Sequence, residues 1–331
     1  MKVSMRSMAL FALVAVGVLA MACGRPAEPP VPAPRAPEPP PTPEVHTAAA
    51  TAWRESHEAN YRYEWVPISG LYTLSPGVHA IGSAADNALV VEGLPPVAGQ
   101  VVVAGDVVRF EPADGVDVVR KGARTRPQPG QPPDARVTGP IVLTATGQAS
   151  APEIAIGDVR LVIHTGGGRL ALRVRDPNSA QAQSFVGFAW FPIDLTYRVV
   201  GRFIADAEPR QLQVINTSND LDTYATEGVV EFTLGGETLR LRPFTTRPNR
   251  FYFVFRDDSS GEETYATARF LYSDLLSDGT TVLDFNEAYN PPCAFNPYTT
   301  CPIPLRENVL PVKILAGERV NPIEEQRTGG R

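Results

Sequence analysis

Lysine is nearly absent from this chain of 331 residues, which has only Lys2, Lys121 and Lys313, so arginine supplies almost all of the positive charge. The formal net charge is −6, and loss of a first segment carrying Lys2 and Arg6 would leave the remainder more acidic. A protein that binds nucleic acid needs a basic surface to neutralise the phosphates. The acidic balance therefore argues against nucleic acid as the main partner.

Histidine is also scarce, and no His-x-x-x-His or His-Glu-x-x-His spacing occurs among His46, His57, His79 and His164. The motifs of zinc hydrolases are therefore absent, and we predict no metal site. The run Gly166-Gly167-Gly168 lies between two strand-like runs and lacks the Lys-Ser or Lys-Thr that would follow in a phosphate loop. It indicates a hairpin turn instead. We expect no cofactor.

The first residues have the pattern of an export signal. Lys2 and Arg6 form a positive start, and the apolar stretch over residues 8–20 is too short for a permanent membrane-spanning helix. Residues 1–22 are therefore predicted to be a signal peptide, and the folded part is expected outside the cytoplasm.

The residues Ala20-Met21-Ala22-Cys23-Gly24 resemble the bacterial lipobox, although the usual leucine lies one position early at Leu19. The resemblance implies that Cys23 is lipidated and anchors the chain to a membrane. Gly24 stands where an aspartate would indicate retention in the inner membrane. The outer membrane, facing the periplasm, is therefore favoured in a Gram-negative cell. The alternative is an ordinary signal peptide followed by a chance cysteine.

A linker is predicted over residues 23–50. Its proline-rich part, residues 25–44, cannot pack a core and is expected to be extended polyproline. At about 3.1 Å per residue this part reaches about 60 Å.

The folded part is expected to begin near Thr51 with one short N-terminal helix, whose apolar face is formed at helical spacing by Trp53, His57, Tyr61 and Trp65. Short apolar runs then alternate with Gly, Pro, Asp and Asn. The pattern predicts a mainly β fold with two β-sandwich- or barrel-like domains, at 51–178 and 179–319. Gly235-Gly236 predicts a hairpin turn. Residues 320–331 are expected to be a flexible tail.

Three stretches carry a resemblance to a known family: LRVRDPNSAQAQSFVGFAWFPID (172–194), FYFVFRDDSSGEETYATARFLY (251–272) and DFNEAYNPPCAFNPYTTCPIPLRENVLPVKILAGE (284–318). From about Trp53 to Glu318 the order of motifs resembles the bacterial DUF1684 family, a group without an assigned function. The resemblance implies a family and brings no mechanism.

The first β domain is similar to a forkhead-associated (FHA) fold. The stretch GLYTLSPGVHAIGSAADNALVV (70–91) has the turn glycine, Asn87 and the following apolar strand of that pattern. The phosphothreonine readers of that family have an arginine after the turn glycine and a Ser-x-x-His in the next loop. Here Ser83 follows Gly82, and residues 96–99 are Pro-Val-Ala-Gly. Without that guanidinium, phosphopeptide binding is not expected, and the domain is interpreted as a scaffold.

Cys293 and Cys301 lie 8 positions apart in a loop rich in proline and asparagine. Outside the cytoplasm two such cysteines most simply form a disulfide. The alternative is a redox pair or a nucleophilic thiol, but Cys-x-x-Cys spacing is missing and no histidine follows His164.

Polar residues of the family-like stretches form the candidate binding surface: Arg173, Arg175, Arg256, Asp257, Tyr265, Arg269, Asp284, Asn286, Tyr289, Asn290 and Tyr298. Polar loops on a rigid β frame are common places for recognition, and tyrosine and asparagine suit sugars or peptides. The alternative is that these residues only tie a long loop to the sheet.

The main functional hypothesis is a membrane-anchored extracytoplasmic lipoprotein that acts as a non-catalytic binding or envelope-assembly module. Its partner would be a small molecule, a glycan or an envelope protein. The alternative is a hydrolase of an envelope or periplasmic substrate, with Asp257, Asp284 or Glu287 as acid and base.

Overall fold

The computed structural model describes residues 32–122, 133–144, 151–166 and 168–320. The predicted signal peptide, Cys23 and residues 321–331 of the predicted tail lie outside these residues. From Ala33 onward the chain forms one compact unit. Strands dominate it, which confirms the mainly β prediction, and its described residues contain two α-helices. Neither described helix is long and apolar enough to cross a membrane.

Helix α1 (Pro43–Glu64) begins earlier than the predicted start at Thr51 and is longer than the short helix that we expected. Thr42 caps it, because its hydroxyl accepts a hydrogen bond from the Val45 N–H at 3.4 Å. Proline in the first turn, with Glu44 beside it, suits a helix start. The last part of the predicted linker is therefore helical.

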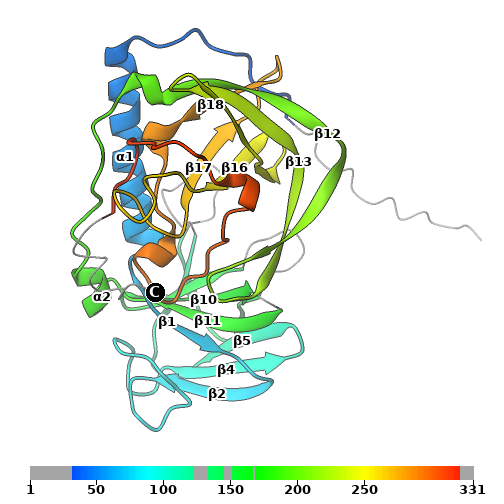
Figure 1. Cartoon of the computed structure of the whole chain (residues 1–331). Coiled ribbons are helices and arrows are strands. Elements are labelled where there is room, and N and C mark those ends of the chain that lie inside the picture. Colours follow the sequence, from blue (N-terminus) through cyan, green and yellow to red (C-terminus); the bar gives the residue numbers. More distant parts are fainter. Residues whose placement is uncertain (1–31, 123–132, 145–150, 167, 321–331) are drawn as a thin grey trace, which may run out of the picture. The chain divides into compact units, whose positions relative to one another are not determined.

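The chain before α1 lies against the second half of the body. Arg35 forms a parallel bridge with Leu276, and the Arg35 carbonyl accepts a hydrogen bond from the Ser277 N–H at 2.9 Å. Figure 1 shows this dark-blue segment leaving the upper end of α1 and crossing toward β18. The body thus holds the chain from Arg35 onward.

Two sheets of the first half pack against a common core. Their strand orders are β1-β11-β10-β9-β6-β7 and β3-β2-β4-β5-β8. The strands of the first sheet are β1 (Ile68–Thr73), β6 (Val118–Lys121), β7 (Ala135–Val137), β9 (Glu153–Ile156), β10 (Val159–Gly166) and β11 (Arg169–Arg175). Those of the second are β2 (Gly77–Gly82), β3 (Leu89–Val90), β4 (Gly99–Ala104), β5 (Val107–Pro112) and β8 (Ile141–Val142).

The second half also has two sheets, ordered β14-β13-β12-β18 and β15-β16-β17. Its strands are β12 (Arg198–Ile215), β13 (Leu221–Leu234), β14 (Glu237–Leu241), β15 (Phe244–Arg247), β16 (Arg250–Phe255), β17 (Arg269–Asp274) and β18 (Thr280–Asp284). Strands β12 and β13 form the long curved ribbon in Figure 1. Gly235 and Gly236 join β13 to β14 with φ angles of 60° and 88°, the conformation that a two-residue hairpin turn requires.

Strand β16 is buried on both faces. Phe251, Phe253 and Phe255 point into one core, shared with β13, β14 and β18. Tyr252 and Val254 point into a second core, which contains Cys301. The alternation of side chains along this strand therefore separates two cores instead of a core and solvent.

The connection between the halves contains helix α2 (Ala180–Gln183) and the 3-10 turn η1 (Leu195–Tyr197). Three more 3-10 turns follow β18: η2 (Phe285–Glu287), η3 (Pro292–Ala294) and η4 (Arg306–Asn308). These three turns lie in the long loop after β18, which contains Asn286, Tyr289, Asn290 and Tyr298 of the predicted surface.

Helix α1 packs on this loop through the face that the sequence predicted. The His57 ring lies 4.4 Å from the Tyr289 ring, and the Trp53 ring lies 6.0 Å from the Trp190 ring. Burial lowers the pKa of His57 to about 3. His57 is therefore neutral at physiological pH and forms part of an aromatic contact.

Candidate functional site

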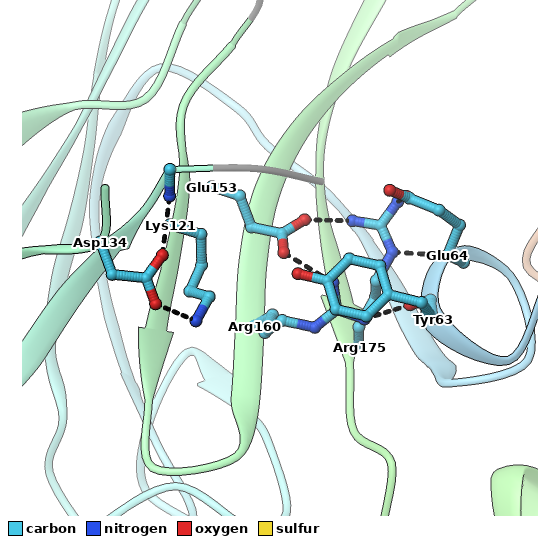
Figure 2. A network of polar contacts seen from close by, with 8 residues as sticks. Tyr63, Glu64, Lys121, Asp134, Glu153, Arg160 and Arg175 are labelled. Carbon is cyan, nitrogen blue, oxygen red and sulfur yellow. Dashed lines mark hydrogen bonds and ion pairs between the residues drawn. The ribbon is translucent and has the colours of Figure 1, made fainter. Parts of the chain in front are cut away.

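Arg175 lies in the interior, at the end of β11, where three hydrogen bonds hold its guanidinium. It donates to Glu153 Oε2 at 2.7 Å, to Glu64 Oε2 at 2.8 Å and to the Glu64 carbonyl at 2.7 Å. Arg160 donates to the other oxygen of Glu153 at 2.7 Å and to the Tyr63 carbonyl. Figure 2 shows that these side chains converge between the end of α1 and the sheet. Arg175 therefore joins α1 to the first half and is not on an open surface.

Arg269 and Asp257 also form an interior pair, and neither side chain is exposed (0% for both). Arg269 Nη1 lies 3.0 Å from Asp257 Oδ2 and donates to the Ile314 carbonyl at 3.0 Å, while Nη2 donates to the Ala316 carbonyl. The Ile314 and Ser259 N–H groups donate to Asp257 Oδ1 at 3.2 and 2.9 Å. The pair thus fixes the last loop to β17.

Asn290 and Tyr289 are likewise held inside the body. The Asn290 backbone N–H donates to Glu318 Oε2 at 2.8 Å, and its side-chain amide donates to Oε1 at 3.0 Å. The Tyr61 hydroxyl donates to the Asn290 carbonyl at 3.0 Å, which connects α1 to the same point. Burial raises the pKa of Tyr289 well above its ordinary value, so its hydroxyl stays neutral.

The remaining candidates divide between surface and interior. Arg256 is exposed and Tyr298 is 39% exposed, so both can meet a partner. Arg173 is buried, with its guanidinium 5.8 Å from the Trp65 ring. Tyr265 is half-buried beside the cysteines. The structure therefore does not assemble the predicted residues into one open surface, because most of their polar groups serve contacts within the body.

Asp284 and Asn286 of the predicted surface belong to a polar cluster where α1 meets the end of β18. His46 on α1 is only 3% exposed, and its Nε2 lies 2.7 Å from Asp284 Oδ2 at the end of β18. The other oxygen of Asp284 accepts hydrogen bonds from the Asn286 backbone at 3.1 Å and side chain at 2.9 Å. Arg54 of α1 donates to the Asn286 carbonyl at 3.2 Å, and Arg198 lies 4.0 Å from Asp284. We call these five residues together with Glu287 the α1–η2 cluster.

Glu287 is the most perturbed acid of the α1–η2 cluster. Burial, with a smaller contribution from the negative charge of Asp284, raises the pKa of Glu287 to about 7. Arg54, Arg198 and Arg250 oppose this rise. A buried carboxyl group with a raised pKa is a candidate general acid. The same pattern also arises where a carboxyl group is only packed into a domain boundary.

Two open hollows lie elsewhere on the described surface. The larger has a volume of about 450 Å³, lies beside the edge strand β14 and is lined by Glu231, Thr238, Leu239, Arg240, Glu307, Val309, Leu310 and Pro311. The smaller has a volume of about 360 Å³ and lies along residues 135–141 of the first half. The larger hollow is next to Arg256, whose backbone N–H donates to the Asn308 carbonyl at 3.0 Å.

The two cysteines of the long loop are neighbours and both are thiols in this structure. The Cys293 N–H donates to Cys301 Sγ at 3.4 Å. Cys293 is half-buried, whereas Cys301 is 3% exposed. The predicted disulfide stays a prediction.

Sequence reasoning missed His46, which it placed in the linker, and the buried acids Glu153 and Glu318. A signal for His46 was present, because Thr42-Pro43 followed by Glu44 is a typical N-cap and first turn. That signal would have placed His46 on α1. No comparable signal marks the two acids, since their partners are distant in the sequence.

The comparison with protein-family models concerns the second half. A family model described as "Protein of unknown function (DUF1684)" matches residues 183–319. Over these residues the chain belongs to the DUF1684 family. The match is narrower than the predicted range of 53–318, since it leaves out the first β half. The DUF1684 segment therefore contains Arg256, Arg269 and the cysteine loop, but not Arg173 or Arg175.

A solved structure similar to the chain is the solution NMR structure of an uncharacterized protein of Haloarcula marismortui. It is 31% identical, and the match covers 44% of this chain and 82% of that one, with a TM-score of 0.36. No curated protein matches the chain.

Proposed function

We propose that the chain is an extracytoplasmic lipoprotein, anchored to a membrane through Cys23, that acts as a non-catalytic binding or envelope-assembly module. The anchor is supported by the lipobox-like residues around Cys23. The outer membrane, facing the periplasm, is the favoured site in a Gram-negative cell.

The observation that carries the binding role is the open hollow beside β14. Small-molecule sites are usually enclosed and bury most of their ligand. This hollow is open, combines Arg240 and Glu231 with apolar Val309 and Leu310, and lies along a strand at the edge of its sheet. Edge strands with adjacent side-chain pockets suit an extended polypeptide. An envelope protein is therefore a better candidate partner than a small molecule or a glycan.

Site-specific photo-crosslinking in the native host tests the binding role. A photoreactive residue at Arg240 or Val309 is expected to capture one envelope protein, identified by mass spectrometry. The same residue at Val107, which is exposed on β5 of the first half, is the matched control. The role is refuted if the positions at the hollow capture nothing or give the same products as Val107.

The anchor has its own test. The full chain is expected to sediment with membranes and to carry acyl chains on Cys23, and Cys23→Ser is expected to lose both properties. Acyl-free wild-type protein in the soluble fraction would contradict the anchor and leave the binding role open.

For the first half we retain the FHA-like scaffold as a proposal. Its support is a core shared by a six-stranded and a five-stranded sheet. In addition, the Asn87 side chain joins two loops by donating to the Ala84 carbonyl at 2.9 Å and the Pro96 carbonyl at 2.8 Å. Phosphothreonine peptides are expected not to bind, and measurable binding in a peptide array would contradict this interpretation.

A carboxylate-dependent hydrolase is the second candidate, and the raised pKa of Glu287 next to Asp284 favours it. Asp257 is no longer a candidate acid or base, because its side chain is fully buried in an ion pair with Arg269 and no substrate can reach it. The test is turnover of peptidoglycan and of fluorogenic glycosides by the purified full chain between pH 5 and 8. Activity that falls above pH 7 and is lost in both Glu287→Gln and Asp284→Asn would support the enzyme. Lack of turnover would remove this candidate.

A further inference from the structure

Two hydroxyl groups lie around the half-buried thiol of the cysteine pair. The hydroxyls of Tyr265 and Thr217, from separate parts of the second half, lower the pKa of the Cys293 thiol. The Thr217 hydroxyl also accepts a hydrogen bond from the Cys301 N–H at 3.1 Å. The two sulfurs differ in exposure, because Cys293 is half-buried and Cys301 is buried.

This asymmetry separates the chemistry of the two thiols. Hydrogen bonds from Cys301 and then from Tyr265 and Thr217 lower the pKa of Cys293 against the opposing effect of burial. Burial, followed by the proximity of Cys293, raises the pKa of Cys301. A half-buried thiol with a lowered pKa beside a buried thiol with a raised pKa is typical of an attacking and a resolving cysteine.

We propose that Cys293 and Cys301 form a reversible dithiol–disulfide couple, in which Cys293 is the attacking thiol and Cys301 the resolving thiol. The hydroxyls of Tyr265 and Thr217 stabilise the Cys293 thiolate. The substrate class is a disulfide, either of a protein or of a small molecule such as glutathione disulfide. The assignment goes beyond the binding role and does not rest on it, since it concerns a different part of the surface.

The exchange is balanced as follows. The Cys293 thiolate attacks one sulfur of the oxidant, whose S–S bond breaks as the mixed disulfide forms, and the second oxidant sulfur leaves as a thiolate that takes up a proton. Cys301 then gives up its proton and attacks Cys293 Sγ, which breaks the mixed disulfide and releases the other oxidant thiol. The protein loses two hydrogens with two electrons, and the oxidant disulfide becomes two thiols.

The couple lies where the two halves of the body meet. Within the loop that it would close, the Asn296 side chain donates to the Ile68 carbonyl at 2.7 Å, and the Phe295 carbonyl accepts from the Gln181 side chain at 2.6 Å. The Cys301 carbonyl accepts from the Thr217 N–H, in the turn between β12 and β13, at 2.9 Å. Oxidation would therefore stiffen the loop that contacts β1, α2 and this turn.

The test begins with the full chain, purified in detergent and equilibrated in buffers of varied glutathione to glutathione disulfide ratio. After acid quenching and alkylation, both cysteines lie in one tryptic peptide, 270–306, because no lysine or arginine intervenes. After alkylation the dithiol form carries two alkyl groups that the disulfide form lacks. We expect the oxidised fraction to change reversibly with the ratio, and a fraction that stays fixed over all ratios would overturn the couple.

The roles of the two thiols are tested by limited alkylation of the reduced wild-type chain at pH 7, with the site of modification located by fragmentation of that peptide. Cys293 is expected to react at least about tenfold faster than Cys301. Tyr265→Phe removes a hydroxyl donor to the thiolate and is expected to slow Cys293 by about tenfold and to shift its pH–rate profile upward.

Tyr298→Phe is the matched control, because it removes a hydroxyl from the same loop without a contact to the thiols, and it is expected to leave the rate and the profile unchanged. Equal rates for the two cysteines, or a Tyr265→Phe chain that reacts like wild type, would overturn the assignment of roles.

Discussion

Replacing Glu287 by glutamine is expected to make the protein more stable at pH 8 and to leave its stability nearly unchanged at pH 5. Burial raises the pKa of Glu287 from 4.5 to about 7 in the folded state, so folding favours the protonated form. The stability that this proton contributes is fully present below pH 4.5, where both states bind it. It is lost as the pH rises through about 7.

The magnitude follows from the same values. A rise from 4.5 to about 7 corresponds to about 3 kcal/mol of free energy of unfolding, lost by the wild type above pH 7. Glu287 is only half-buried, so this figure is an upper bound. Glutamine has nearly the same shape and carries no charge at any pH. The variant is therefore expected to gain up to about 3 kcal/mol at pH 8.

The assay is urea unfolding of the full chain in detergent at pH 5, 6, 7 and 8, for the wild type, Glu287→Gln and Glu262→Gln. Glu262 is an exposed acid that pairs with Lys313 at 2.8 Å and serves as the matched control, without a gain at pH 8. The reasoning is refuted if Glu287→Gln is less stable than wild type at pH 8. It is equally refuted if both chains lose the same stability between pH 5 and pH 8.

Three other substitutions test the assignment of the predicted site residues to structural contacts. Asp257→Ala leaves the Arg269 charge buried without its ion-pair partner and is expected to destabilise the fold by about 3–5 kcal/mol, so an unfolding midpoint like that of wild type would contradict the interior pair. Glu153→Gln weakens the ion pair with Arg175 and is expected to lower the free energy of unfolding by about 2–3 kcal/mol in the same urea assay. An unchanged free energy of unfolding would contradict the buried network. Tyr298→Ala is expected to change stability by less than about 0.5 kcal/mol, and a larger loss by calorimetry would show that this side chain is packed.

The sequence predicted those features that depend on local pattern. Short apolar runs between turn residues correctly indicated strands, and Gly235-Gly236 indicated a hairpin because both positions need a positive φ. The spacing of Trp53 and His57 correctly indicated one face of a helix. These signals lie within a few residues of one another, so no knowledge of the tertiary structure is needed to interpret them.

The candidate site could not be predicted in the same way, because its geometry depends on pairs that are far apart in the chain. His46 and Asp284 are separated by 238 positions, and Arg269 meets a carbonyl 47 positions away. A sequence shows which side chains are polar, but not whether a buried partner already satisfies them. For this reason the predicted binding surface contained residues, such as Arg175, that the fold uses internally.

The bridge between Arg35 and Leu276 limits how far the body can stand from a lipid surface. The proposed anchor at Cys23 lies 12 positions before Arg35, a stretch that is shorter than the whole proline-rich segment. Its greatest reach is about 37 Å at about 3.1 Å per residue, against about 60 Å for the full segment. Partners that bind this protein would therefore lie close to the membrane that carries the anchor.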